Sequence, residues 1–294
     1  MSSSFQLPAA ASEGFKNATA YDTHRPSYPQ EAVDSLLSKL GLLSPSGDNE
    51  PRVRIVEVAS GTGKFTELLA AKYSNMYTNR DEEGPLEVIA VEPHEGMRTQ
   101  LLAAGKEKKK NLKGVKVVDG HAGELPVGDG WGDGYLAAQS FHWFANEDTL
   151  KEAYRVLKSG KGMGIIWNVE DYNKPEAWKA TTEWEEKLNE WIRSIPSDGN
   201  PRFRDGKWRD AFNNQKLFSL PLGEQTVKWT VWLSEEALWS RINTLSQVAV
   251  LEGQERESAI RVFKEALQSD DVERNSKGEV ALHGITYFVW TKKI

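Results

Sequence analysis

The sequence contains no cysteine among its 294 residues, which excludes a disulfide framework, a thiolate nucleophile and a cysteine metal site. No apolar stretch approaches the roughly 20 residues that cross a bilayer. The first residues, MSSSFQLPAAASEGF, have neither the basic nor the apolar region of a secretory signal. The net charge of −6 argues against a nucleic-acid-binding surface, which needs concentrated positive charge. These absences predict a cytoplasmic protein that binds neither nucleic acid nor membrane.

What is present is a regular alternation of strand and helix patterns in the first half of the chain. Continuous β-branched runs predict strands, and segments with helical spacing follow them. The expected strands are 53–58, 86–91, 115–118, 134–138 and 162–167, and the expected helices are 30–40, 64–72, 95–104 and 146–157. Strands that alternate with helices predict an α/β fold, with a parallel sheet covered on both faces.

The pattern changes after Asn168, where most of the eleven tryptophans occur. The spacing there predicts helices over 175–192, 206–214, 234–251 and 252–268, and strands over 225–233 and 284–292. Trp184 and Trp191 are seven residues apart and are expected on one helix face. Together with Trp178 they are candidates for closing a substrate pocket, although core packing is the alternative interpretation.

One small-residue loop, in the stretch IVEVASGTGKFT at 55–66, is typical of a ligand-binding turn. A nucleoside triphosphate loop is excluded, because Lys64 is followed by Phe65 and Val58 stands where the first glycine is required. A dinucleotide loop has Gly61 and Gly63 but Thr66 in place of its third glycine, so this interpretation is weak but open.

S-adenosylmethionine is the third ligand class, and it needs two acids rather than a pyrophosphate site. One acid lies near the ammonium group of its methionine part, and the other binds the ribose hydroxyls. Glu57 and Glu92 stand at the ends of the first two predicted strands, at the edge where open parallel sheets bind ligands. Both acids beside one glycine loop favour S-adenosylmethionine.

Several ordered blocks carry a family resemblance over most of the chain: YDTHRPSYP, EVASGTGKFT, VIAVEPHEGM, VVDGHAGELP, AAQSFHWF and EAYRVLKSGKGMGIIWN. They resemble the S-adenosylmethionine-dependent class I methyltransferases, and within them the trans-aconitate methyltransferase-like small-molecule branch. The resemblance implies a Rossmann-like, doubly wound, mostly parallel seven-stranded sheet with an antiparallel last strand. It also implies a lid segment at 1–29, a cofactor-binding core at 30–168 and a C-terminal half, 169–294, with helical caps over the substrate, all in one structural domain.

The resemblance also implies the residues that bind the cofactor, whose product is S-adenosylhomocysteine. They are Tyr21, Arg25, Glu57, Ala59, Ser60, Gly61, Gly63, Glu92, Pro93, Met97, His121, Ala122 and Gln139. Three places depart from the family pattern, one of them the turn at 158–161, which lacks the usual Pro-Gly-Gly. Ala59 replaces the first loop glycine, so its φ is expected to be negative. His121 and Ala122 precede Gly123 where the family has a small hydroxyl, alanine and glutamate.

The acceptor side is expected at His142, which follows the fourth strand and is a candidate base, and at Trp143, a candidate pocket wall. Arg202 and Arg204 are candidates for recognising an anionic acceptor, or else surface charges. The expected reaction is metal-independent methyl transfer to a small organic molecule, by a monomer or homodimer. Two alternatives stay open: S-adenosylmethionine binding without methyl transfer, and, more weakly, a nicotinamide-dependent dehydrogenase.

Overall fold

The computed structural model describes residues 27–43, 52–76, 85–107 and 112–294. A seven-stranded sheet runs through it in the order β3-β2-β1-β4-β5-β7-β6. The pairs among β1 to β5 are parallel, whereas β7 is antiparallel to both neighbours. This confirms the predicted α/β sheet with its antiparallel last strand. The bounds are β1 (Val53–Val58), β2 (Leu86–Val91), β3 (Val115–Val118), β4 (Gly132–Ala138), β5 (Leu157–Glu170), β6 (Gly223–Leu233) and β7 (Val280–Lys292).

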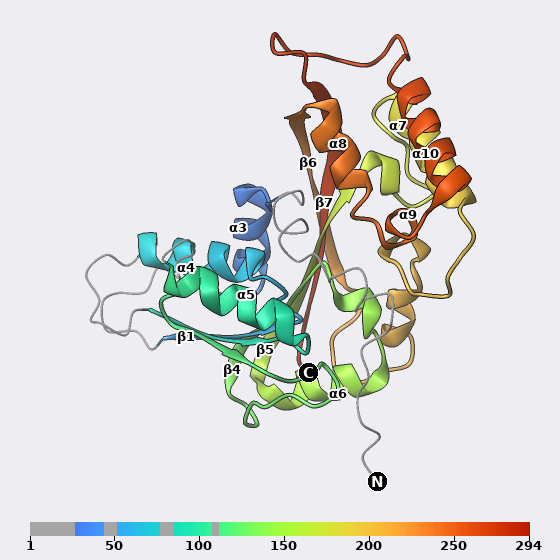
Figure 1. Cartoon of the computed structure of the whole chain (residues 1–294). Helices are drawn as coiled ribbons and strands as arrows, with labels where there is room; N and C mark the ends of the chain where they lie inside the picture. Colours follow the sequence, from blue (N-terminus) through green and yellow to red (C-terminus); the bar gives the residue numbers. More distant parts are fainter. Residues whose placement is uncertain (1–26, 44–51, 77–84, 108–111) are drawn as a thin grey trace.

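Helices cover both faces of the parallel half, with α3, α4 and α5 on one side and α6 on the other (Figure 1). Leu36 and Phe65 lie in the core beneath the first group, and Leu150 lies in the core on the opposite face. The Asn146 side chain caps α6 by accepting a hydrogen bond from the backbone N–H of Thr149 at 2.9 Å. The bounds are α3 (Gln30–Lys39), α4 (Lys64–Met76), α5 (Glu95–Lys106) and α6 (Glu147–Val156).

The strands β5, β6 and β7 are longer than the sequence predicts. Strand β5 continues past Ile166, where its pairing with β4 ends, because β7 goes on pairing with it up to Glu170 opposite Gly284. Beyond this point β6 and β7 run on together, and the remaining helices lie beside their far ends (Figure 1). We call this part the cap. Its helices are α7 (Glu183–Ser194), α8 (Glu235–Ile242), α9 (Ser246–Ala249) and α10 (Gly253–Ala266).

The predicted helix at 175–192 is wrong in its first eight residues, since α7 begins at Glu183. Two carboxylates bind the backbone of the preceding segment instead. Asp171 accepts a hydrogen bond from the N–H of Thr181 at 2.6 Å, and Glu186 accepts one from Ala180 at 3.2 Å. Backbone groups held by these side chains are not available for helical hydrogen bonds.

The predicted helix at 234–251 is also wrong, because it is broken into α8 and α9. The Thr244 hydroxyl donates to the carbonyl of Arg241 at 2.7 Å and occupies a group at the end of α8. The segment 206–214 forms a 3₁₀ helix, η4 (Lys207–Phe212), after a shorter one, η3 (Phe203–Asp205). Two more short 3₁₀ helices come after strands of the sheet: η1 (Phe141–Trp143) begins two residues beyond β4, and η2 (Asp171–Asn173) follows β5 directly.

Candidate active site

The two predicted acids lie at the carboxyl edge of the sheet, at the ends of β1 and β2. Glu57 and Glu92 are 1% and 4% exposed. The Glu92 carboxylate accepts hydrogen bonds from the backbone N–H groups of Gly61 and His94, each at 2.8 Å. Burial raises the pKa of Glu92, and these two hydrogen bonds and the Arg98 charge partly offset the rise. Glu92 therefore ties the glycine loop to the end of the second strand.

Ala59 corrects one expectation, since its φ is +53° and not negative. The backbone N–H of Ser60 donates to the carbonyl of Val91 at 3.2 Å, which draws the loop toward β2. We attribute the left-handed turn at Ala59 to this bond between strands. The loop thus keeps the left-handed backbone conformation that glycine adopts easily. Ala59 adopts it although its Cβ makes this conformation unfavourable.

The surroundings of the other loop residues show whether the loop suits a ligand. The Ser60 hydroxyl is buried and has no hydrogen-bond partner among the described residues, as expected of a group that meets a polar ligand. A Cβ on Gly61 would lie 3.7 Å from Met97, an ordinary van der Waals distance, so the φ of +59° and not crowding explains the glycine. A Cβ on Gly63 would lie 2.2 Å from Leu101, so Gly63 is required for packing against α5.

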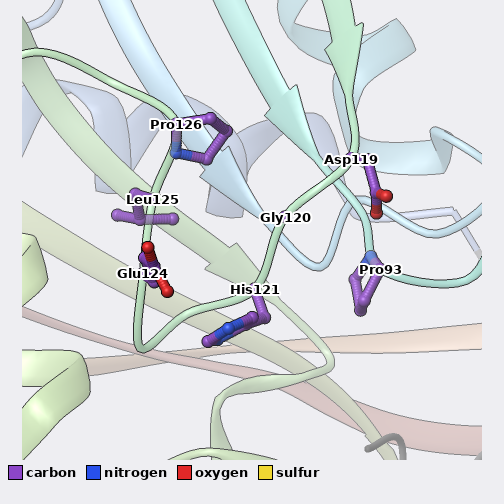
Figure 2. A pocket seen from close by; sticks show the side chains of 7 residues that line it. All are labelled: Pro93, Asp119, Gly120, His121, Glu124, Leu125 and Pro126. Atoms are coloured by element: carbon purple, nitrogen blue, oxygen red, sulfur yellow. The ribbon is translucent and has the colours of Figure 1, made fainter. Parts of the chain in front are cut away.

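A pocket of about 510 Å³ lies beside this edge (Figure 2). It contains Pro93 and His121 of the predicted adenine side, whereas the buried Met97 and Ala122 are not in its wall. Its full lining is Pro93, Asp119, Gly120, His121, Glu124, Leu125 and Pro126.

Asp119 is a pocket residue that the sequence reasoning missed. Its carboxylate is 73% exposed and lies 2.8 Å from the guanidinium of Arg98, which also binds the backbone carbonyls of Glu92 and Pro93. The sequence could have indicated Asp119 by its position directly after β3, because the end of this third strand lies at the same edge of the sheet.

His142 lies in η1, and its Nδ1 accepts a hydrogen bond from the Trp167 Nε1–H at 3.2 Å. An indole nitrogen only donates, so Nδ1 carries no proton and the neutral ring carries its proton on Nε2. The ring of Trp143 lies next to His142, with centroids 5.5 Å apart. In this form Nε2–H is the hydrogen-bond donor of the ring, and its acceptor atom, Nδ1, is engaged by Trp167.

Gln139 has a φ of +59° and closes the end of β4. Its side-chain oxygen accepts from the backbone N–H of Asn168 at 3.1 Å, and its side-chain nitrogen donates to the Asn168 carbonyl at 3.0 Å. The amide of Gln139 thus joins β4 to β5, and its predicted position near the cofactor sulfur stays a prediction. The predicted contacts Tyr21 and Arg25 lie outside the described residues.

Comparisons with known proteins bear on this edge of the sheet. Residues 56–163 match the family described as a methyltransferase domain. An uncharacterized methyltransferase-like protein of Schizosaccharomyces pombe is 30% identical over 244 residues, which are 83% of this chain and 81% of that protein. The chain belongs to the class I S-adenosylmethionine-dependent methyltransferases. An uncharacterized methyltransferase of Mycobacterium tuberculosis H37Rv shares 29% identity with this methyltransferase over 92% of its chain and 91% of the relative.

Solved structures show the same fold. The YcgJ protein of Bacillus subtilis superposes with a TM-score of 0.53 at 16% identity, covering 90% of this methyltransferase and 99% of that chain. A candidate type II methyltransferase from Anaeromyxobacter dehalogenans gives a TM-score of 0.54 at 17% identity, and the superposition covers 92% of this methyltransferase and 97% of that chain. The narrower resemblance to the trans-aconitate branch stays a prediction.

The three predicted pocket tryptophans lie in two different places in this methyltransferase. Trp184 is 0% exposed in the core of the cap, with Trp191 packed against that core, so Trp184 does not line a pocket. Trp178 instead contacts Phe203 and Tyr287, with ring centroids 5.8 and 5.7 Å apart. Of the three predicted pocket tryptophans, only Trp178 lies in the aromatic cluster that contains Trp167.

Two further observations concern metal ions and membranes. In the described part of the methyltransferase, no group of three or more acidic or histidine side chains is placed to bind a metal ion. Every helix in the same residues is too short or too polar to span a bilayer.

Proposed function

We propose that this methyltransferase moves the methyl group of S-adenosylmethionine to a small organic acceptor by in-line displacement. The observation that carries the proposal is that β1, β2 and β4 end at one edge, with the acids and glycine loop on one side and His142 on the other. Glu57, the loop from Ala59 to Gly63 and Glu92 would hold the methionine and ribose parts. Pro93 and His121, which line the pocket, would contact the adenine.

The sulfonium supplies an activated methyl group, so the chain's own contribution is to position the acceptor and exclude water. The tautomer of His142 supports this division. Its Nε2–H offers a hydrogen bond that orients an acceptor atom, while the Trp167 bond occupies Nδ1. Such a histidine suits an acceptor that arrives without a proton to lose, such as a carboxylate, rather than an alcohol that needs a base.

Two histidine variants with opposite expected effects test the proposal. His142→Ala should lower the rate of S-adenosylhomocysteine formation about tenfold or more and leave the Kd for S-adenosylmethionine within about twofold. His121→Ala should weaken cofactor binding, and saturating cofactor should restore its turnover. Calorimetry gives the Kd, and product release is followed over a panel of carboxylates, phenols, amines and thiols.

Two results would contradict the proposal. A large loss of cofactor affinity in His142→Ala would move His142 to the cofactor side. Wild-type protein that binds S-adenosylmethionine tightly but forms no S-adenosylhomocysteine with any acceptor would argue for cofactor binding without transfer.

A further inference from the structure

Three arginines come together in the cap, and two of them have carboxylate partners. Arg193 lies 2.6 Å from Glu176. Arg202 is bound more fully: its guanidinium lies 2.8 Å from Asp198 and donates to the side-chain oxygen of Gln247 at 2.7 Å. Both positive charges are therefore compensated locally.

Arg204 is the exception. It is half-buried, and its side chain donates a hydrogen bond to the neutral amide oxygen of Asn173. Within the described residues no carboxylate lies within ion-pair distance of it. Burial and then the nearby Arg202 and Arg193 charges lower the pKa of Arg204 to about 10, while the Asp205 and Asp198 charges partly offset the fall, so Arg204 remains charged at neutral pH. A half-buried charge beside two like charges is costly unless an anion accompanies it.

The position of Arg204 links it to the acceptor side. Asn173 ends η2, directly after the carboxyl end of β5. The neighbouring residue Phe203 packs on Trp167 with ring centroids 4.8 Å apart, and Trp167 is the residue that donates to His142. The segment that carries Arg204 is therefore held, through Phe203, against the ring that donates to the proposed acceptor-binding histidine.

A second polar group in this region also lacks a partner. Gln247 is 5% exposed on α9, and the hydrogen bond from Arg202 holds its amide in place. Its side-chain nitrogen is buried and makes no hydrogen bond to any described residue. A buried donor of this kind implies an acceptor atom that the described residues do not supply.

We infer that Arg204 binds a carboxylate group of the methyl acceptor and thereby selects small carboxylic acids with an apolar or aromatic body. The inference rests on the proposed methyl transfer. A guanidinium that forms no ion pair with the described residues matches a single negative charge, and its planar fork fits a carboxylate. The apolar body is inferred from Phe203, the residue before Arg204, whose ring packs on those of Trp167 and Trp178. Arg202, which the sequence groups with Arg204, has a structural role instead.

Binding of benzoate, with benzamide as its neutral isostere, tests this inference through the tryptophan fluorescence of the full chain. Saturating S-adenosylhomocysteine is present, so that the cofactor side is filled. Benzoate should bind wild-type protein, and Arg204→Gln should weaken it about 10- to 100-fold, as expected for the loss of a charge-assisted hydrogen-bond pair. Arg204→Lys should fall between them. Arg193→Gln, the matched control with the same change in charge, should bind benzoate like the wild type.

Several outcomes would overturn the inference. They are equal binding of benzoate and benzamide, no benzoate response up to about 50 mM, unchanged affinity in both Arg204 variants, or stronger binding of inorganic phosphate than of benzoate. Thermal unfolding of each variant separates lost binding from lost folding, and Arg204→Lys retains the charge if Arg204→Gln does not fold. Cofactor calorimetry is read separately: failure of wild-type protein to bind S-adenosylmethionine would reject the proposed function, whereas the benzoate result still decides the role of Arg204.

Discussion

Replacing Ala59 by glycine should make the protein more stable, although the substitution adds flexibility. At a φ of +53° the Ala59 side chain crowds the following carbonyl oxygen. That left-handed conformation costs about 1–2 kcal/mol for a residue with a Cβ. Glycine removes this cost but loses about 0.4–1 kcal/mol more backbone entropy on folding. The difference is a gain of about 0–1.6 kcal/mol in the free energy of unfolding, and its central value of about 0.8 kcal/mol corresponds to about 2–3 °C in Tm for a chain of this size.

Urea unfolding followed by circular dichroism measures this difference, with Ala138→Gly as the matched control. Ala138 is also partly buried but lies in β4, outside the set of positive-φ residues. Its replacement should therefore lose about 0.5–1 kcal/mol. If Ala59→Gly is destabilised like Ala138→Gly, the left-handed strain assigned to Ala59 is refuted.

Three other changes have defined expectations. Glu92→Gln should weaken S-adenosylmethionine binding about 10- to 100-fold in calorimetry; in the wild type, affinity should fall as the pH drops through the raised pKa of Glu92, because the protonated carboxyl is a poorer acceptor. Arg241→Met should cost about 3–5 kcal/mol in urea unfolding, because the buried Glu170, 3.1 Å away, loses its partner, and the double variant with Glu170→Leu should recover most of this. The hydrogen bond to Glu185 raises the pKa of His283, so the stability from this pair is complete below about pH 6.5 and is lost as the pH rises through the raised value. The Tm difference between wild type and His283→Gln should accordingly shrink with rising pH. Burial also raises the pKa of Glu185, so the comparison begins at about pH 6, where this carboxylate is still ionised.

The first half of the fold was predictable from the sequence because its signals are local. The strands at 53–58, 86–91 and 115–118 are observed with the predicted bounds, since each is a short β-branched run ended by turn residues. The carboxyl edge of the sheet then follows from strand order alone, and it locates Glu57, Glu92 and His142.

The errors arise where distant groups decide the local conformation. The segment before α7 is not helical because Asp171 and Glu186 hold its backbone. The φ of Ala59 is set together with a hydrogen bond from Ser60 to a neighbouring strand. Arg202 and Arg204 also cannot be told apart from the sequence, because only their partners in the fold distinguish them. None of these contacts has a periodic signal along the chain.

The double hydrogen bond between Gln139 and Asn168 has a mechanical consequence. It fastens the end of β4 to a point inside β5, just beyond the last backbone pairing of the two strands. His142 stands three residues after one end of this brace, and Trp167 stands one residue before the other. We expect the two rings to move as one rigid body, with their separation preserved when ligands enter or leave. Any closing motion over a bound acceptor must then come from segments outside this braced unit.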